Sequence, residues 1–286
     1  MAIKLEEVNY IYGQGTELVV DALKDVNIEI GDGEFVGVIG HTGSGKSTLV
    51  QHLNGLIKPT SGHIYFDGQD IYADGYNMKQ HRSKVGLVFQ YLEHQLFETD
   101  VLADVCFGPK NLGMKKEEAE AQAKHALSLV GLDESYYKRS PFDLSGGQKR
   151  RVAIAGVLAM EPKMLILDEP TAGLDPQGRK EILELISRLR REAGITIVLV
   201  SHSMEDVAEY VDRIIVMNKG CVAYDGQPKD VFAHYKELEE MGLAAPQVTY
   251  IVHNLKEKGL EVKTDAITIE EAAKDIIEAL KAQKKG

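Results

Sequence analysis

The sequence predicts an α/β fold built on a largely parallel β-sheet, with an antiparallel β part and a helical subdomain beside it. Four short apolar runs have the composition of strands buried on both faces of such a sheet; they span residues 34–39, 85–89, 164–168 and 195–200. Between the last two runs, residues 182–189 repeat apolar side chains at three- and four-residue steps, as on one face of a helix. Strands that alternate with helices indicate a parallel sheet with helical crossovers.

Shorter strands bounded by turn residues account for the antiparallel part. Residues 3–12 and 22–30 are expected strands, each followed by a glycine-containing turn, and a strand at 64–66 ends at an Asp-Gly pair. Residues 214–217 and 221–224 form a last pair of strands around an Asn-Lys-Gly turn.

Helical patterns fill the middle of the chain. Residues 100–160 lack strand signals, and 115–130 are rich in Ala, Glu and Lys with a weak apolar stripe. We therefore expect a helical subdomain over about residues 91–160.

The composition shifts again near Gly242, after which two short helices are expected. Apolar residues over 248–255 follow the i, i+3, i+4, i+7 spacing, and Thr268 with Glu271 resembles a capping box that opens a second helix. The chain is thus divided into a main domain, residues 1–242, and a small α-rich C-terminal extension, residues 243–286.

Composition restricts the possible functions. With 286 residues, 44% of them hydrophobic, the chain can bury a large core, and its net charge of −11 argues against a nucleic-acid partner. Cys106 and Cys221 stand far apart and are expected to be reduced thiols. The N-terminus has no signal-peptide pattern and no apolar run is long enough to cross a bilayer, so we expect a soluble protein that can still associate with a membrane partner.

A phosphate-binding loop follows the first buried strand. Residues 40–47 fit the pattern G-x-x-x-x-G-K-[ST], and the strand before it and the apolar helix pattern after it, which extends to Leu56 and Ile57, give the required context. Backbone N–H groups of such a loop and the following helix N-terminus bind phosphates, while Lys46 reaches the β- and γ-phosphates and Ser47 ligates Mg²⁺. The predicted ATP-binding residues of this segment are Gly40, His41, Thr42, Gly43, Ser44, Gly45, Lys46, Ser47 and Thr48.

Two carboxylates end the strand at 164–168. Asp168 is placed to hold the Mg²⁺ shell, and Glu169 beside it can accept a proton from the water that attacks the γ-phosphate. Paired acids at a strand end are also common as solvated turns, but a preceding phosphate loop favours the catalytic interpretation.

A further motif, Leu144-Ser145-Gly146-Gly147-Gln148, lies between the helical stretch and Asp168. Alone, Ser145 would suit a helix N-cap. In the observed order of phosphate loop, Gln90, LSGGQ, Asp168-Glu169, Asp175 and His202, residues 1 to about 235 resemble the ATPase subunit of an ABC transporter. The resemblance implies an ATPase that uses ATP and Mg²⁺.

The resemblance assigns roles to matching positions. Tyr12 looks like the aromatic residue that stacks on adenine, although a strand-end tyrosine is an alternative, and Gln90 resembles the glutamine that ligates Mg²⁺ and senses the membrane partner. Asp175 resembles the aspartate at the dimer seam, and His202 the switch histidine that contacts the γ-phosphate. The motif that closes over ATP on the opposite subunit is Ser145, Gly146, Gly147 and Gln148.

Within this family the chain is most similar to the energy-coupling-factor branch, which powers uptake of vitamins and of cobalt or nickel ions. The similarity lies in the sequences of residues 89–97, 140–142 and 150–160. The sequences of His41-Thr42 and of residues 51–55 are most similar to the second of the two ATPase subunits of this branch. The C-terminal extension resembles the dimerising extension of this branch.

The resemblance also implies partners and a location. These are a second ATPase subunit, a transmembrane coupling protein and a substrate-binding membrane protein, with the chain on the cytoplasmic side of the cell membrane as a peripheral subunit. A heterodimer is favoured, and a homodimer remains open because the chain carries every motif. The alternatives are an importer fed by a binding protein, an ATPase acting on DNA, and a translation factor.

A docking surface is expected after Gln90. A helix over residues 100–107 would help form the groove for the membrane partner, and Leu92 departs from the proline typical of that position in the family. The alternative is that the apolar residues of this helix belong to the subdomain core; they are Val101, Leu102, Val105 and Phe107.

Overall fold

Two β-sheets and the helices around them make up the computed structural model, which describes residues 3–91 and 95–283. The strands are β1 (Ile3–Tyr12), β2 (Val20–Ile30), β3 (Phe35–Ile39), β4 (Ser61–Phe66), β5 (Gln69–Asp70), β6 (Val85–Val88), β7 (Met164–Asp168), β8 (Thr196–Val200), β9 (Arg213–Asn218) and β10 (Cys221–Gly226). The α-helices are α1 (Lys46–Leu53), α2 (Met78–Lys84), α3 (Val101–Asn111), α4 (Lys116–Leu129), α5 (Gly146–Leu158), α6 (Pro176–Ala193), α7 (Met204–Tyr210), α8 (Pro228–Ala233), α9 (Tyr235–Glu240), α10 (Gln247–Glu257) and α11 (Ile269–Gln283). The predicted α/β fold is confirmed.

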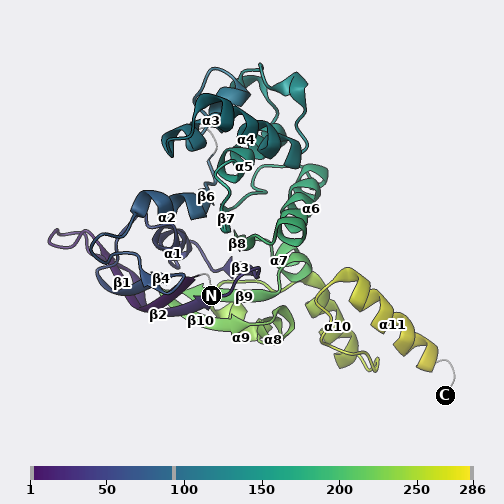
Figure 1. Cartoon of the computed structure of the whole chain (residues 1–286). Coiled ribbons are helices and arrows are strands. Elements are labelled where there is room, and N and C mark those ends of the chain that lie inside the picture. The colour runs from purple at the N-terminus through teal and green to yellow at the C-terminus, as the bar shows by residue number, and fades with distance from the viewer. Residues whose placement is uncertain (1–2, 92–94, 284–286) are drawn as a thin grey trace.

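The larger sheet has six strands in the order β10-β9-β3-β8-β7-β6 and is parallel except for the antiparallel β9–β10 pair. The smaller sheet, β2-β1-β4-β5, is antiparallel. In Figure 1, α3, α4 and α5 gather above the strands of the larger sheet, β1, β2 and β4 lie at the lower left, and α10 with α11 lies at the lower right. No helix within residues 3–91 and 95–283 is both long and apolar enough to span a bilayer.

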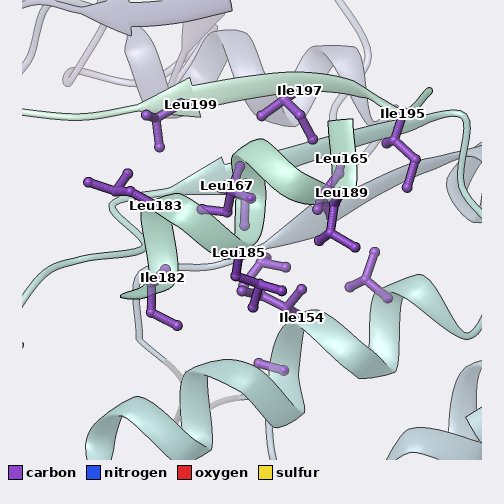
Figure 2. Packing of buried hydrophobic residues seen from close by; sticks show 14 of the residues in the cluster. Ile154, Leu165, Leu167, Ile182, Leu183, Leu185, Leu189, Ile195, Ile197 and Leu199 are labelled. Atoms are coloured by element: carbon purple, nitrogen blue, oxygen red, sulfur yellow. The ribbon is translucent and has the colours of Figure 1, made fainter. Parts of the chain in front are cut away.

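Alternation along the buried strands gives the larger sheet two apolar faces. One core cluster, shared with α5 and α6, contains Leu165, Leu167, Ile197 and Leu199. The alternate residues of the same strands, such as Ile166 and Val198, belong to a second cluster with α1 and the smaller sheet. Figure 2 shows side chains of β7, β8, α6 and α5 converging in the first cluster. The sheet and the helical subdomain are therefore held together through α6.

Leu185 on α6 offers a test of this packing. Its side chain is 3% exposed inside the first cluster, so Leu185→Ala should lower the free energy of unfolding by about 2–5 kcal/mol through lost burial and a residual cavity. Chemical denaturation followed by circular dichroism measures the change. Arg191→Ala, on the exposed side of the same helix, is the control and should shift it by no more than about 0.5 kcal/mol; equal shifts would contradict the packing argument.

Two helix boundaries differ from the expected pattern in detail. Helix α1 ends at Leu53, so Leu56 and Ile57 do not continue its apolar stripe; Gly55 adopts φ 71° and turns the chain away. Helix α11 begins as expected with Thr268 Oγ1 accepting from the N–H of Glu271 at 3.3 Å, but the Glu271 carboxylate accepts from the N–H of Ile267, not of Thr268.

Candidate functional site

The predicted phosphate, metal and catalytic residues follow neighbouring parallel strands. Val38 of β3 pairs with Val200 of β8, Val200 pairs with Asp168 of β7, and Val88 of β6 pairs with Leu167. Strands in this register end at one edge of the sheet, where ligands bind in open α/β sheets. The structure therefore brings the phosphate loop, Gln90, Asp168-Glu169 and His202 to one edge.

The phosphate loop needs glycine where it enters α1. Gly45 has φ 106°, and a Cβ there would lie 2.7 Å from the carbonyl oxygen of Ala22. The N–H of Gly220, in the β9–β10 turn, donates to the carbonyl of Ser44 at 3.0 Å. The loop therefore packs closely against β2 and is hydrogen-bonded to the β9–β10 turn.

Lys46 points its ammonium group back into the loop. Its Nζ donates to the carbonyl oxygens of Gly40 at 2.7 Å and His41 at 3.1 Å, and the residue is 7% exposed. Burial lowers the pKa of Lys46, whereas the charges of Glu169 and Asp168 raise it. A buried ammonium group enclosed by the loop is suited to a charge-assisted contact with phosphate.

The three residues predicted to hold Mg²⁺ all offer oxygen atoms as ligands. Burial raises the pKa of Asp168, whereas the charge of Lys46 and a hydrogen bond from the Ser47 side chain lower it. Mg²⁺ prefers oxygen ligands and keeps several waters beside one or two carboxylates and substrate phosphates. The residues present fit this ion, with the Gln90 amide available two residues after β6.

Glu169 occupies a strained and partly desolvated position. Its φ of 51° is in the left-handed region, which is uncommon for a residue with a side chain and clusters at functional sites. Burial, followed by the neighbouring charge of Asp168, raises the pKa of Glu169 to about 7. The His202 Nε2 lies 3.2 Å from its Oε1, without hydrogen-bond geometry. A carboxylate with this pKa can accept a proton near neutral pH.

Tyr12 stands at the edge of the loop with its ring partly open. Its hydroxyl lies 3.3 Å from the hydroxyl of Thr48, and its ring meets Tyr10 edge-on at 4.7 Å. The residue remains 40% exposed, so part of its ring is free for an incoming base. This geometry is compatible with adenine stacking.

The LSGGQ motif folds as the N-terminus of α5, away from the phosphate loop. Ser145 Oγ accepts from the N–H of Gln148 at 3.3 Å, and Gln148 Oε1 accepts from the N–H of Ser145 at 3.0 Å, which completes a capping box. With Gly146, Gly147 and Asp175, these residues line a hollow of about 590 Å³. Asp175 itself caps α6, its Oδ1 accepting from Gly178 N–H at 2.6 Å. The predicted site residues therefore fall into two groups on one chain.

The sequence analysis missed two residues that support the motif. Tyr136 places its hydroxyl 3.2 Å from Gln148 Nε2, and Arg150, two residues after Gln148 on α5, is 4% exposed. For Arg150 a signal existed, because Ala153, Ile154 and Val157 follow it at helical spacing on the buried face of α5. A charged residue on an apolar stripe calls for a specific partner.

A mostly apolar groove of about 390 Å³ lies between α2, α3, α5 and the end of α1, with the charged residues Lys79, Arg82 and Asp104 also in its lining. Its lining includes Phe97 and Phe107, which meet edge-on at 4.8 Å and are 55% and 42% exposed. The expected groove residues of α3 are only partly right: Val101, Leu102 and Val105 are buried in the core, and Phe107 alone of the four is exposed. Leu92 lies outside the described residues.

Comparison with known proteins agrees with the motif order. The family model described as ABC transporter matches residues 23–172. The "Energy-coupling factor transporter ATP-binding protein EcfA2" of Clostridium tetani is 56% identical over 97% of this chain and 96% of its own, and that of Clostridium perfringens is 54% identical over 98% and 99%.

Solved structures give the same result. The structure of cbiO1 from Clostridium perfringens, described as part of the ABC transporter complex cbiONQ, is 42% identical with a TM-score of 0.75 and covers 89% of this chain and 98% of its own. A dimeric, post-hydrolysis structure of the ATP-binding cassette MJ0796 bound to ADP and Pi is 34% identical, with a TM-score of 0.71 over 79% of this chain and 98% of its own.

Proposed function

Since this chain belongs to the ABC transporter family, among the energy-coupling factor transporter ATP-binding proteins, we propose that it hydrolyses ATP to energise a membrane importer of vitamins or of cobalt or nickel ions. The observation that carries the proposal is the grouping of Lys46, Asp168, Glu169 and His202 at one edge of the parallel sheet. Ser145 and its neighbours, in the separate hollow, are suited to act on ATP held by another subunit.

In this mechanism each ATP lies between the phosphate loop of one subunit and the LSGGQ motif of the other. Lys46 binds the β- and γ-phosphates, Glu169 accepts the proton of the attacking water, and His202 contacts the γ-phosphate. Mg²⁺, held by Ser47, Asp168 and Gln90, would neutralise charge that develops on the phosphates. Binding closes the two subunits and hydrolysis reopens them.

The second subunit is proposed to be another ATPase of the family, with the C-terminal extension contributing to the dimer. Three apolar residues of α11 support this role because they are exposed: Ile269 at 71%, Ile277 at 51% and Leu280 at 45%. The dimeric cassette structure among the similar proteins supports pairing in general.

The apolar groove is proposed to receive a helix of the transmembrane coupling protein, which would hold this chain at the cytoplasmic face of the membrane. Phe107 and Phe97 present rings to that groove, and Gln95 from the segment after Gln90 also lines it. A rigid-body movement of the helical subdomain would then be transmitted to the membrane protein.

Phe107→Asp tests docking and function together. Because the charge would stand in an apolar groove, the variant should lose co-purification with the membrane protein after mild detergent extraction, by at least about tenfold, while basal ATPase persists. The control Phe107→Leu should retain both. Full co-purification of Phe107→Asp would contradict the groove assignment, and absence of membrane proteins with the unmutated chain would contradict the transporter role.

A further inference from the structure

Arg150 is a buried cation whose contacts the mechanism above does not use. It lies on α5, two residues after the end of the LSGGQ motif, and is 4% exposed. The neighbouring buried residues of α5, such as Val152 and Ile154, belong to the apolar core cluster. Burying a guanidinium group is costly unless its donors are satisfied, so its partners identify what it holds.

Two of its partners are backbone carbonyl groups on two other segments. One terminal nitrogen, Nη1, donates to the carbonyl oxygen of Gln90 at 3.1 Å, and the other, Nη2, donates to that of Ala172 at 3.1 Å. These carbonyls are 60 and 22 residues away from Arg150 in the sequence. The planar, forked guanidinium is suited to bridging two acceptors in fixed positions.

Both acceptors belong to the chain's own nucleotide site. Gln90 provides a candidate Mg²⁺ ligand, and the N–H of Ala172 donates to the carbonyl of Glu169 at 3.2 Å, so Ala172 closes the turn that begins at the candidate general base. The helix that carries Arg150, by contrast, begins at Ser145 and presents the LSGGQ motif. One side chain therefore links the residues that serve the chain's own ATP to the motif that serves its partner's ATP.

We propose that Arg150 is a positioning residue that couples the two ATP sites of the dimer inside a single subunit. When the LSGGQ motif closes on the partner's ATP, α5 carries the guanidinium with it, and the two hydrogen bonds bring Gln90 and the Glu169–Ala172 turn into place around the chain's own ATP. This inference rests on the proposed function, since it requires composite sites.

The test uses the complex of this chain with its partner ATPase and the membrane components. Vanadate trapping of 8-azido-ATP, followed by photolabelling, reports each site separately, because the label stays on the chain whose phosphate loop holds the nucleotide. Arg150→Met, which keeps length but removes both bonds, should reduce trapping on both chains by about 10- to 100-fold, as expected for misplaced catalytic groups. Nucleotide affinity of the chain alone should stay within about twofold, since Lys46 and its loop are untouched.

Two variants make the result specific. Arg150→Lys keeps the charge and can reach one carbonyl at a time, so it should restore trapping on both chains to an intermediate level. Arg188→Met is the matched control: Arg188 also donates to a backbone carbonyl across α6 and the subdomain, that of Leu129 at 2.9 Å, but it lies outside both sites. It should trap nucleotide as the unmutated complex does.

Several outcomes would overturn the proposal. Unchanged trapping by Arg150→Met, or a loss confined to one of the two chains, would remove the coupling role. A parallel loss of nucleotide binding and of thermal stability in the chain alone would make Arg150 a residue of the fold only. An unmutated complex without vanadate-sensitive ATPase would instead contradict the proposed function, whatever Arg150 does.

Discussion

Replacing Glu169 by glutamine is expected to lower ATP turnover by ~10²- to 10⁴-fold while ATP remains bound. The amide has nearly the size of the carboxylate but cannot accept the proton of the attacking water. Burial and Asp168 raise the pKa of Glu169 to about 7, so the wild-type group is a carboxylate of unusually high proton affinity and its loss removes more than a charge. The closed, ATP-bound dimer should accumulate.

Steady-state ATPase, ATP binding and size-exclusion chromatography with ATP measure the three parts of this expectation. Lys46→Ala is the comparison, because it removes the ammonium contact with phosphate and should weaken binding itself. Glu169→Gln and Lys46→Ala should thus both be inactive but should differ in ATP affinity and in dimer formation. Near-normal turnover by purified Glu169→Gln protein would exclude Glu169 as the general base.

The second large effect concerns subunit composition. Suppose that the chain formed a working homodimer, and that Lys46→Ala subunits were mixed with Ser145→Arg subunits. In the mixed dimer one ATP site would join the altered phosphate loop to the altered LSGGQ motif, and the other site would have both parts unaltered. Part of the ATPase activity would therefore return. We expect no such recovery, because the proposed unit is a heterodimer with a second ATPase. Full activity should return only when that partner is added to the unmutated chain.

The measurement is ATPase activity against the ratio of the two variants, with each variant mixed with itself as the control. The separation of Lys46 and Ser145 into different groups of one chain makes the experiment possible, since each substitution damages only one half-site. Strong, concentration-dependent ATPase from the chain alone, together with recovery on mixing, would overturn the heterodimer.

Much of the architecture follows from local sequence patterns. The buried strands β7 and β8 were predictable because short apolar runs end in polar residues, β3 because its apolar run precedes the glycine-rich phosphate loop, and α11 because Thr268 marked its start. The end of α1 was not, because the apolar spacing continues to Leu56 while the positive φ of Gly55 ends the helix. Periodicity does not record where a glycine is used as a stop.

The motif residues could be found from order and spacing, whereas their supporting contacts could not. Arg150 reaches Gln90 and Ala172 across segments that only the tertiary fold brings together. The same limit applies to α3, where pattern alone did not separate the core residue Val105 from the exposed Phe107. Burial of one helix face depends on which neighbours cover it, and these are set by the packing of the whole subdomain.

The left-handed backbone of Glu169 also bears on how ATPase pairs diverge. At φ 51° a glutamate carries conformational strain that asparagine, aspartate or glycine would relieve. Mutation of this position to asparagine or glycine would therefore remove the carboxylate and relieve the strain in one step, and selection for activity opposes such a change. If an active partner subunit relieved this chain of that selection, we would expect its ATPase activity to be lost first by substitution at this position, with its fold intact.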